Sequence, residues 1–403
     1  MSQQLINRSS DLSRLRDDGF NIEVRGNHLL VNEVPYLNSQ REVRYGTLIS
    51  ELTLAGDVTT TPGTHVAFFV GEHPCNKDGT EMQKIKHKSK NTALGANLVA
   101  SHSFSSKPKE GYPNYYEKMR TYYNIVSGPA RSIDPNVMVA VPLVVSPPEE
   151  ASVFQYVDTA SSRSNISAVT EKLSIGPVAI VGLGGTGSYV LDLIAKTPVL
   201  EIHLFDGDDY LQHNAFRSPS APSIDDLREK PKKVNFFQRL YSKMHKFIHA
   251  HPEFIDDSNI DQLTGMAFVF VCLDKGEPRQ LIIKTLQDAG VPFIDVGMGV
   301  ELVDDKLLGV LRVTASTPGM MDHVGSKVPF SDFDDDEYSS NIQIADLNAL
   351  NAALAVIKWK KLCGFYLDLE SEHFSTYTID GNKLINEDLN AASEARVCRV
   401  HPR

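Results

Sequence analysis

One glycine-rich turn constrains the fold of this chain more than any other feature. Gly182, Gly184 and Gly187 occupy the positions of a G-x-G-x-x-G pattern. The pattern follows the β-branched apolar run Pro177–Val181, which predicts a strand, and precedes the helical pattern of Thr186–Lys196. The first glycine permits a tight turn, the second lets the backbone approach a phosphate, and the third lets the helix pack on the strand. This context favours a nucleotide-binding turn over a purely structural one, because phosphates would face the N–H groups at the helix N-terminus.

Strands and helices alternate after this turn. We expect strands at Glu201–Phe205, Ala267–Cys272, Val291–Val296 and Leu307–Val313, helices at Val234–Ile248, Gln280–Ala289 and Ile342–Cys363, and a closing hairpin at His373–Ile379 and Lys383–Ile385. Strands that alternate with helices of this length form parallel sheets through right-handed crossovers. The predicted fold class of residues 175–403 is therefore α/β, with a Rossmann-like doubly wound sheet.

The sequence pattern of residues 1–145 lacks the strand–helix alternation of the second half and predicts an α+β domain. We expect a hairpin at Ile22–Arg25 and His28–Val34, strands at Thr64–Val70 and Asn97–Ser103, a solvated lysine-rich loop at Asn76–Asn91 and a helix at Tyr115–Val126. Residues 146–174 are rich in Ser, Thr and Pro and are the expected linker. The residues of the first domain suggest no catalytic mechanism, so docking of a partner protein is its default role.

Charge and cysteine usage exclude several classes of protein. The net charge of −11 argues against binding of nucleic acid through general phosphate neutralisation. The sequence shows no signal segment and no apolar run of 18 residues. Its four cysteines are scattered without a CxxC pair, which indicates reduced thiols and neither a disulfide framework nor a four-cysteine zinc site. We therefore expect a cytoplasmic protein that contacts neither nucleic acid nor a membrane.

Polar residues after the second strand of the α/β half distinguish two kinds of nucleotide enzyme. Asp206 ends that strand, where an acidic side chain can accept hydrogen bonds from a ribose. Asp208, Asn214 and Arg217 follow closely. A hydride-transfer enzyme needs no further carboxylate, amide and arginine there. An enzyme that attacks the α-phosphate of ATP must neutralise the triphosphate, hold magnesium and stabilise the leaving pyrophosphate.

These residues resemble the ThiF/MoeB adenylyltransferases and the adenylation domains of ubiquitin-activating enzymes. The resemblance covers about residues 162–312. It rests on five elements in order, namely the glycine turn, the Asp206-x-Asp208-x5-Asn214-x2-Arg217 spacing, the run Lys230-Pro231-Lys232-Lys233, Asp274 after an apolar strand, and Arg279. Taken singly, the aspartates could cap a loop and the lysines could begin a solvated helix. Their occurrence as a set favours the family reading.

The resemblance implies a role for each matching position. Asp206 would hold the ATP ribose, Asn214 and Arg217 would contact the phosphates, and Arg217 would stabilise charge in the transition state. Lys233 or its neighbour Lys232 would reach the phosphates. A small insertion leaves open which of Lys230, Lys232 and Lys233 aligns with the lysine of the family. Asp274 would bind Mg²⁺. Arg163 lies where the family has an arginine that reaches into the other subunit's ATP site, which implies a homodimer. The implied nucleotide-binding set is Gly182, Gly184, Gly185, Gly187, Asp206, Asp208, Asn214, Arg217, Lys232, Lys233 and Asp274.

The implied function is ATP- and Mg²⁺-dependent adenylation of the C-terminal carboxylate of a small ubiquitin-like protein with a glycine-rich C-terminus, in a bacterial defence or modification pathway. An NAD-dependent Rossmann oxidoreductase would account for the glycines and Asp206 but leaves Arg217, the lysines and Asp274 unexplained. A catalytically inactive ThiF-like scaffold is disfavoured, because the acidic and basic residues of the set are all retained.

The chain also departs from the family pattern. It lacks the paired CxxC motifs of a structural zinc site, and the segment where ubiquitin-activating enzymes carry their nucleophilic cysteine, about residues 314–341, instead contains the acidic run 332–337. Cys272 lies in an apolar strand, where we expect an inert packed thiol. Cys75 and Cys398 are the candidates for an exposed thiol, and Cys398 lies between arginines. We therefore predict adenylation without a thioester, with a thioester on Cys398 as the alternative.

Two groups of histidines could be read as metal sites, but the sequence disfavours this reading for both. His245 and His249 are four residues apart and would share a face of the expected helix, for which a polar helix face is the simpler reading. In the first half, His73, Cys75, His87 and His102 could converge on a metal, although their spacing matches no zinc pattern.

Overall fold

The computed structural model describes residues 2–134, 137, 152–163, 166–274, 276–330 and 342–387. The chain divides into two compact units, residues 1–171 and 172–403, and each is described by itself. The division falls inside the segment expected as a linker. Among the helices of these residues, none has the length and apolar character needed to cross a membrane.

The first unit is an antiparallel sheet covered by helices. Its strand order is β1-β2-β3-β6-β8-β7, and a separate two-stranded ribbon pairs β4 with β5. The strands are β1 Ile22–Arg25, β2 His28–Leu37, β3 Val43–Glu51, β4 Leu54–Ala55, β5 Val58–Thr59, β6 Val66–Val70, β7 Lys86–Gly95 and β8 Leu98–Ser105. The helices are α1 Ser2–Arg8, α2 Ser10–Asp17, α3 Tyr115–Ile133, α4 Thr159–Arg163 and α5 Ser167–Thr170, and the 3₁₀ turn η1 Glu171–Leu173 spans the boundary between the units.

Helix α3 forms much of the core of this unit. It begins at a cap in which the Asn114 side chain accepts a hydrogen bond from the Glu117 N–H at 2.9 Å. Its buried face carries Tyr115, Met119 and Tyr122, which pack with the inward residues of β2 and β3. The α+β class of this half and the hairpin of β1 and β2 are confirmed. The expectation of a solvated loop at Asn76–Asn91 is wrong in part, because β7 begins at Lys86 with mostly exposed side chains at the sheet edge.

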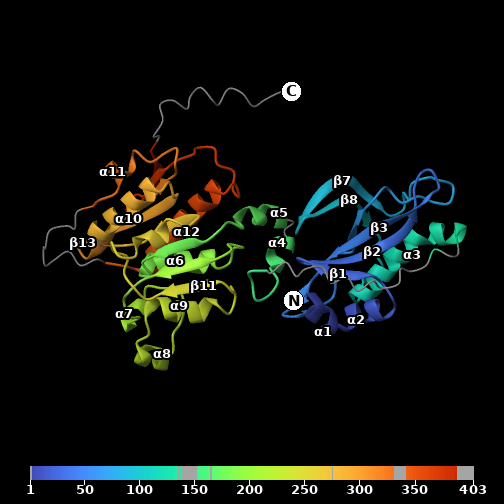
Figure 1. Ribbon diagram of the computed structural model, residues 1–403, viewed down its shortest axis with the longest axis horizontal. Coiled ribbons are helices and arrows are strands. Elements are labelled where there is room, and N and C mark those ends of the chain that lie inside the picture. Colours follow the sequence, from blue (N-terminus) through green and yellow to red (C-terminus); the bar gives the residue numbers. More distant parts are fainter. Residues whose placement is uncertain are drawn as a thin grey trace, which may run out of the picture. The chain divides into compact units, whose positions relative to one another are not determined.

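The second unit is the expected doubly wound α/β sheet (Figure 1). Its strand order is β11-β10-β9-β12-β13-β14-β15-β16, parallel from β11 to β13 and antiparallel from there to β16. The strands are β9 Val178–Val181, β10 Ile202–Phe205, β11 Ile248–His251, β12 Phe268–Val271, β13 Phe293–Val303, β14 Lys306–Ser316, β15 Phe374–Thr378 and β16 Lys383–Asn386. The helices are α6 Gly185–Ile194, α7 Gln212–Ala215, α8 Ile224–Glu229, α9 Lys233–Tyr241, η2 Ile260–Leu263, α10 Gly276–Asp288, α11 Val324–Lys327 and α12 Ala345–Leu362.

Two apolar layers enclose this sheet. On one face the core includes Leu191 of α6, Phe237 of α9 and Trp359 of α12. On the other face it includes Ile283 of α10 and Leu263 of η2. The central strands β9 and β12 are fully buried, which explains their uninterrupted apolar sequences.

The order of the parallel strands fixes where a ligand can bind. The chain runs from β9 outward through β10 to β11 and then returns to β12 on the other side of β9. At such a reversal the crossovers leave in opposite directions, and a crevice opens at the carboxyl ends of the two central strands. The loops at this crevice are the glycine turn after β9 and the segment Cys272–Asp274 after β12.

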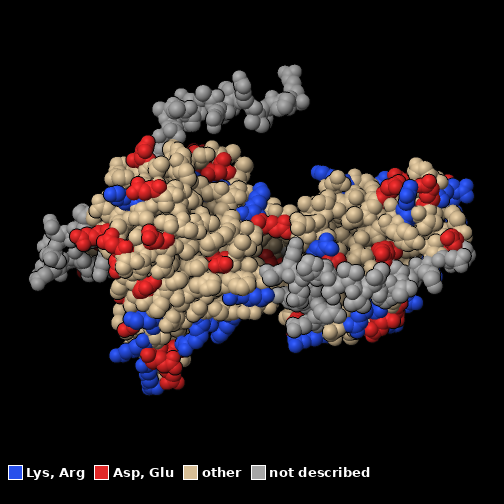
Figure 2. All heavy atoms as spheres, in the orientation of Figure 1, with Lys and Arg blue, Asp and Glu red and all other residues tan. Residues whose placement is uncertain are grey.

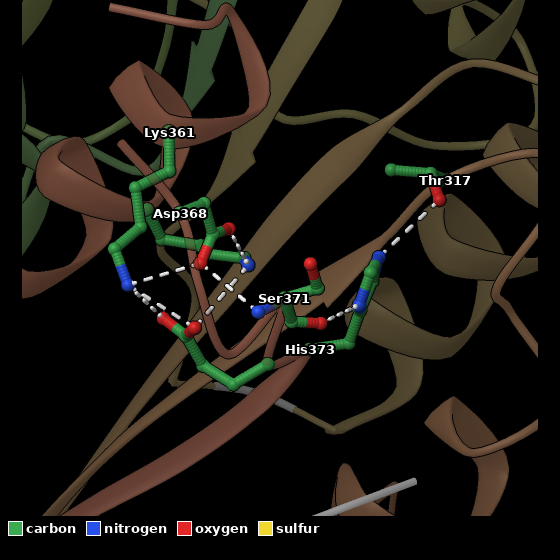
Figure 3. Close-up of polar contacts among 7 residues, drawn as sticks. Thr317, Lys361, Asp368, Ser371 and His373 are labelled. Atoms are coloured by element: carbon green, nitrogen blue, oxygen red, sulfur yellow. Dashed lines mark hydrogen bonds and ion pairs between the residues drawn. The ribbon is translucent and has the colours of Figure 1, made fainter. Parts of the chain in front are cut away.

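The predicted helix over Val234–Ile248 is too long. α9 ends at Tyr241, and Ile248 begins the edge strand β11, which pairs with β10. The hairpin expected at the end of the chain is confirmed as β15 and β16. The connection between α12 and β15 is held by ion pairs in which Lys358 and Lys361 contact Asp368 and Glu372, and Lys361 lies 2.9 Å from a Glu372 oxygen (Figure 3).

Candidate nucleotide site

The glycine turn places a helix N-terminus directly after the central strand. Gly182 has φ +89°, and a Cβ there would lie 2.5 Å from the Cys272 carbonyl oxygen of the neighbouring strand end. A Cβ on Gly187 would overlap the Gly182 carbonyl oxygen, whereas one on Gly184 would meet nothing within 4 Å. Two glycines are therefore required by the packing of the turn. Gly184 has open space beside it and stands at the N-cap of α6, where free N–H groups favour an anion.

Asn348 of α12 connects this turn to the loop after β10. It is fully buried, its Oδ1 accepts a hydrogen bond from the Thr186 hydroxyl at 3.0 Å, and its Nδ2 donates to the Arg217 carbonyl at 3.2 Å. The amide lies so close to Gly185 that any Cβ there would overlap it. The sequence analysis missed Asn348. Its only signal was an asparagine on the apolar face of a long helix, where an amide requires specific partners.

Asp206 and Lys233 form a buried ion pair at the carboxyl end of β10. Asp206 accepts hydrogen bonds from the N–H groups of Leu183 (2.7 Å) and Asp208 (2.9 Å). Lys233 Nζ lies 3.4 Å from Asp206 Oδ2 and 2.7 Å from Asp208 Oδ2, and the side chains of Lys233 and Asp206 are only 7% and 6% exposed. Asp206 thus holds the glycine turn, the loop after β10 and the start of α9 together, and its carboxylate retains lone pairs for a further donor.

The three candidate lysines have different environments. Lys233 is the buried one, at the first residue of α9. Lys232 is partly exposed and contacts the Gly207 carbonyl and Asp209 Oδ1 at 2.8 and 2.9 Å. Lys230 is an exposed residue in left-handed conformation at the end of α8. Of the three, Lys233 is the one buried against Asp206 and Asp208.

Asn214 and Arg217, both in the segment after β10, each have a buried side-chain N–H group without a hydrogen-bond acceptor. Asn214 is buried, and its Oδ1 accepts a hydrogen bond from the Leu211 N–H at 2.8 Å, but its Nδ2 is buried without a hydrogen-bond partner. Arg217 Nε is also buried without such a partner. Burial, followed by the charges of Arg217 and Lys233, lowers the pKa of the nearby His213. A group that supplies negatively charged oxygen atoms would satisfy both donors and the local positive charge.

The loop after β12 supplies an exposed carboxylate, Asp274, at the other side of the crevice. Arg279 of α10 does not face solvent. It is buried, donates to the carbonyls of Leu273 and Pro329, and lies 3.4 Å from the fully buried Asp295, which also pairs with Arg312 at 2.7 Å. Arg279 therefore braces the loop that carries Asp274.

Three sequence predictions lie outside what the structure describes. The side chain of Arg163, at the end of α4, is among them, as are the acidic run 332–337 and Cys398. Cys75 does lie within the described residues, and the expectation that it could be exposed is wrong, since it is 1% exposed. Burial raises the pKa of Cys75 and of Cys272, and it raises the pKa of Cys363 to about 11. None of these three thiols has the lowered pKa of a reactive cysteine.

The expectation that His245 and His249 share a helix face is wrong, whereas the rings of His73 and His102 do pack together, with centroids 5.0 Å apart. His245 follows the end of α9 and is buried with its Nε2 against the Val199 carbonyl at 2.8 Å, whereas His249 lies on β11. Among the described residues, no group with metal-ligand geometry contains His73, Cys75, His87 or His102. The one group that has it consists of Glu201, His203 and His249.

The described surface of the second unit carries both signs of charge. At α8, the lower end of this unit in Figure 2, basic and acidic side chains alternate, and Arg239 pairs there with Asp226 at 2.7 Å and Glu229 at 3.3 Å. These exposed pairs contribute little to stability. They differ from the Asp206–Lys233 pair of the candidate nucleotide site, which is buried.

Known protein structures resemble part of this chain. Among solved structures, the chain is similar to PaaA (TM-score 0.44, 20% identity, 57% of this chain and 68% of that one). It is also similar to E. coli MccB crystallised with MccA-N7isoASN (TM-score 0.46, 21% identity, 56% and 68%) and to E. coli MccB crystallised with ATP (TM-score 0.43, 22% identity, 56% and 67%). The comparison with curated proteins gives no match.

Two family models match successive parts of the chain and meet at residues 159 and 160, about 12 residues before the boundary of the compact units. Residues 10–159 match a domain of unknown function, DUF6791. Residues 160–302 match the ThiF family and contain the glycine turn, the Asp206–Lys233 pair, the two unsatisfied donors and Asp274. The chain thus combines an N-terminal DUF6791 domain with a ThiF-family domain whose Rossmann-like sheet carries the candidate nucleotide site.

Proposed function

We propose that this chain binds ATP and Mg²⁺ and adenylates a carboxylate, specifically the C-terminal carboxylate of a small ubiquitin-like protein. The observation that carries the proposal is the pair of buried donors without partners, Asn214 Nδ2 and Arg217 Nε, in a loop tied by Asn348 to the glycine turn. Such donors are costly in the folded protein unless a ligand accepts from them. Triphosphate oxygens would satisfy this need, and the N-terminus of α6 adds further N–H donors.

In this proposal each residue of the site has a separate role. Asp206 accepts hydrogen bonds from the ribose, and Lys233, Asn214 and Arg217 hold the phosphates. Asp274 contributes an oxygen ligand to Mg²⁺, which neutralises charge on the phosphate oxygens. The already ionised carboxylate of the partner forms a bond to the α-phosphorus as the bond to the bridging oxygen breaks, so pyrophosphate leaves with that oxygen. Because no proton has to move, the protein's contribution is positioning and stabilisation of charge.

ATP binding is the first test, because it needs no partner protein. Calorimetric titration of the full chain with a non-hydrolysable ATP analogue and Mg²⁺ should give binding that Arg217→Ala weakens, while Arg228→Ala, an exposed arginine on α8, leaves it unchanged. Titration with NAD should give none. Binding of NAD in place of the ATP analogue would support the oxidoreductase alternative.

Adenylation itself is tested by exchange of labelled pyrophosphate into ATP in the presence of ubiquitin-like proteins with glycine-rich C-termini, beginning with any encoded beside this gene. Arg217→Ala and Asp274→Ala should each reduce exchange on the order of 10²–10³-fold, the loss typical of one removed charge-stabilising group. ATP binding without exchange by any such partner would favour the inactive scaffold. Near-normal exchange by either variant would refute the site assignment.

We further propose that two chains form a homodimer in which Arg163 reaches the partner's ATP site, and that the N-terminal domain of residues 1–145, joined by the linker 146–174 to residues 175–403, docks a conjugating partner. An inactive Arg163→Ala chain mixed with an inactive Asp274→Ala chain should then regain exchange through hybrid dimers, because one of the two sites would be intact. A fully active monomer in sedimentation would refute the shared site.

The product is proposed to be the acyl-adenylate, passed directly to an acceptor. The buried thiols Cys75, Cys272 and Cys363 are poor nucleophiles because burial raises each pKa. Enzyme, ATP and partner should therefore give no reductant-sensitive conjugate on a non-reducing gel. A conjugate that disappears in Cys398→Ser would replace this proposal with a thioester on the C-terminal segment.

A further inference from the structure

A cluster of histidines lies at the edge of the α/β sheet, apart from the residues assigned to the nucleotide. β10 and β11 pair in parallel with His203 opposite His249 and Phe205 opposite His251. Because the two positions on each strand are two residues apart and are paired across the strands, the four side chains share one face of the sheet. Their rings form a continuous row, with centroids 4.7 Å apart from His249 to His203, 5.3 Å from His203 to His251 and 4.2 Å from His251 to Phe205.

Glu201, just before β10, places a carboxylate oxygen close to ring nitrogens of His203 and His249. Its Oε2 lies 3.3 Å from His203 Nε2 and 3.7 Å from His249 Nε2, and one ligand atom from each of the three residues lies within 4.8 Å of the others. In a tetrahedral complex with bonds of about 2.0–2.1 Å, ligand atoms are separated by roughly 3.3 Å. The two carboxylate–imidazole distances thus need little adjustment. His249 and Glu201, about half exposed, have the freedom to make it.

His251 contacts His203 and can fix the orientation of the His203 ring. Its Nε2 lies 3.0 Å from His203 Nδ1, the ring nitrogen that faces away from Glu201. A histidine that binds a metal through Nε2 commonly donates its Nδ1–H to a neighbouring acceptor, which fixes the tautomer and the ring orientation. His251 is itself held by stacking on the buried Phe205. The cluster therefore has three ligands and a partner that orients the least exposed of them, since the His203 side chain is 18% exposed.

We propose that Glu201, His203 and His249 bind a divalent transition-metal ion, for which Zn²⁺ is the best chemical match. Two imidazoles and one carboxylate suit Zn²⁺ and discriminate against Mg²⁺, which prefers oxygen ligands. Three protein ligands leave one coordination position for water or for a group from outside. The site uses none of the residues assigned to ATP or to its Mg²⁺, and it does not depend on the proposed function.

The test is a Zn²⁺ titration of the full-length chain after removal of metals with EDTA, in excess Mg²⁺, with a chromophoric chelator as competitor. His249→Asn and Glu201→Gln remove ligands and should each weaken Zn²⁺ binding more than 100-fold. His251→Gln removes only the supporting residue and should weaken it about 10–100-fold. The matched controls are His87→Asn, an exposed histidine of the first unit, and Glu253→Gln, an exposed glutamate after β11, and both should bind like the parent chain.

Co²⁺ supplies a second readout that structural damage alone does not produce. Co²⁺ bound by the parent chain should give the visible absorption of a four-coordinate complex, and this absorption should be absent in His249→Asn while the fluorescence of the buried Trp359 is unchanged. Absence of Zn²⁺ binding by the parent chain would overturn the proposal. Binding that His249→Asn and Glu201→Gln leave unaltered would also overturn it, because the metal would then be held elsewhere.

Discussion

Removal of the buried lysine at the candidate nucleotide site should destabilise the second unit far more than removal of its half-exposed neighbour. Lys233→Met leaves the Asp206 carboxylate, 6% exposed, without its cation. Breaking a buried ion pair by removing one partner costs about 3–5 kcal/mol. We expect the lower end, about 3 kcal/mol, because Asp206 still accepts hydrogen bonds from the Leu183 and Asp208 N–H groups. Lys232→Met removes a half-exposed pair with Asp209 and should cost less than about 1 kcal/mol.

The chain provides its own probe for this measurement. Trp359 is the single tryptophan, and it is fully buried in the core of the second unit, so its fluorescence during urea unfolding reports on this unit. With an m-value of about 3 kcal/mol/M, a loss of about 3 kcal/mol lowers the urea midpoint by about 1 M. The double variant Lys233→Met/Asp206→Asn should be less destabilised than the sum of the single variants, because the uncompensated charge is gone. Equal midpoints for Lys233→Met and Lys232→Met would refute the reasoning.

Three further predictions concern packing and pH. Gly187→Ala should destabilise the second unit by several kcal/mol, on the order of an overpacked core or more, because its Cβ would overlap the Gly182 carbonyl. Gly325→Ala, which has open space around it on α11, should be neutral in the same tryptophan-detected unfolding. Asn348→Ala should cost about 1–3 kcal/mol and weaken ATP-analogue binding, since it leaves the Arg217 loop untied, and unchanged binding would contradict this role. Burial lowers the pKa of Lys118 to about 7, so the unfolded chain binds this proton more strongly than the folded one. The first unit should therefore gain stability as pH rises from 7 towards 9. Hydrogen exchange of α3, corrected for intrinsic rates, should show this gain, and Lys118→Met should abolish it.

Local sequence patterns determined much of the second unit. The alternation of apolar strands with helices predicted the parallel sheet, and the glycine turn predicted the strand–turn–helix connection of the candidate nucleotide site, because both depend on neighbours close in sequence. The same patterns failed where the boundary was set by a distant partner. Residues after Tyr241 continue a helical pattern, yet Ile248–His251 form a strand because β10 offers an open edge. Likewise, the lysine-rich residues from Lys86 read as a solvated loop, but β8 pairs with them at the edge of the first sheet.

The tertiary structure alone decided which polar residues act together. The sequence could not choose among Lys230, Lys232 and Lys233. The choice depends on which side chain is buried against Asp206 and Asp208. The sequence also offered no reason to connect Asn348 with Arg217, which lie 131 positions apart. It grouped His249 with His245 by helical spacing, whereas parallel pairing places His249 beside His203. Chemistry at a site depends on side chains brought within a few ångströms, and for residues on different strands that proximity is fixed by strand order and register.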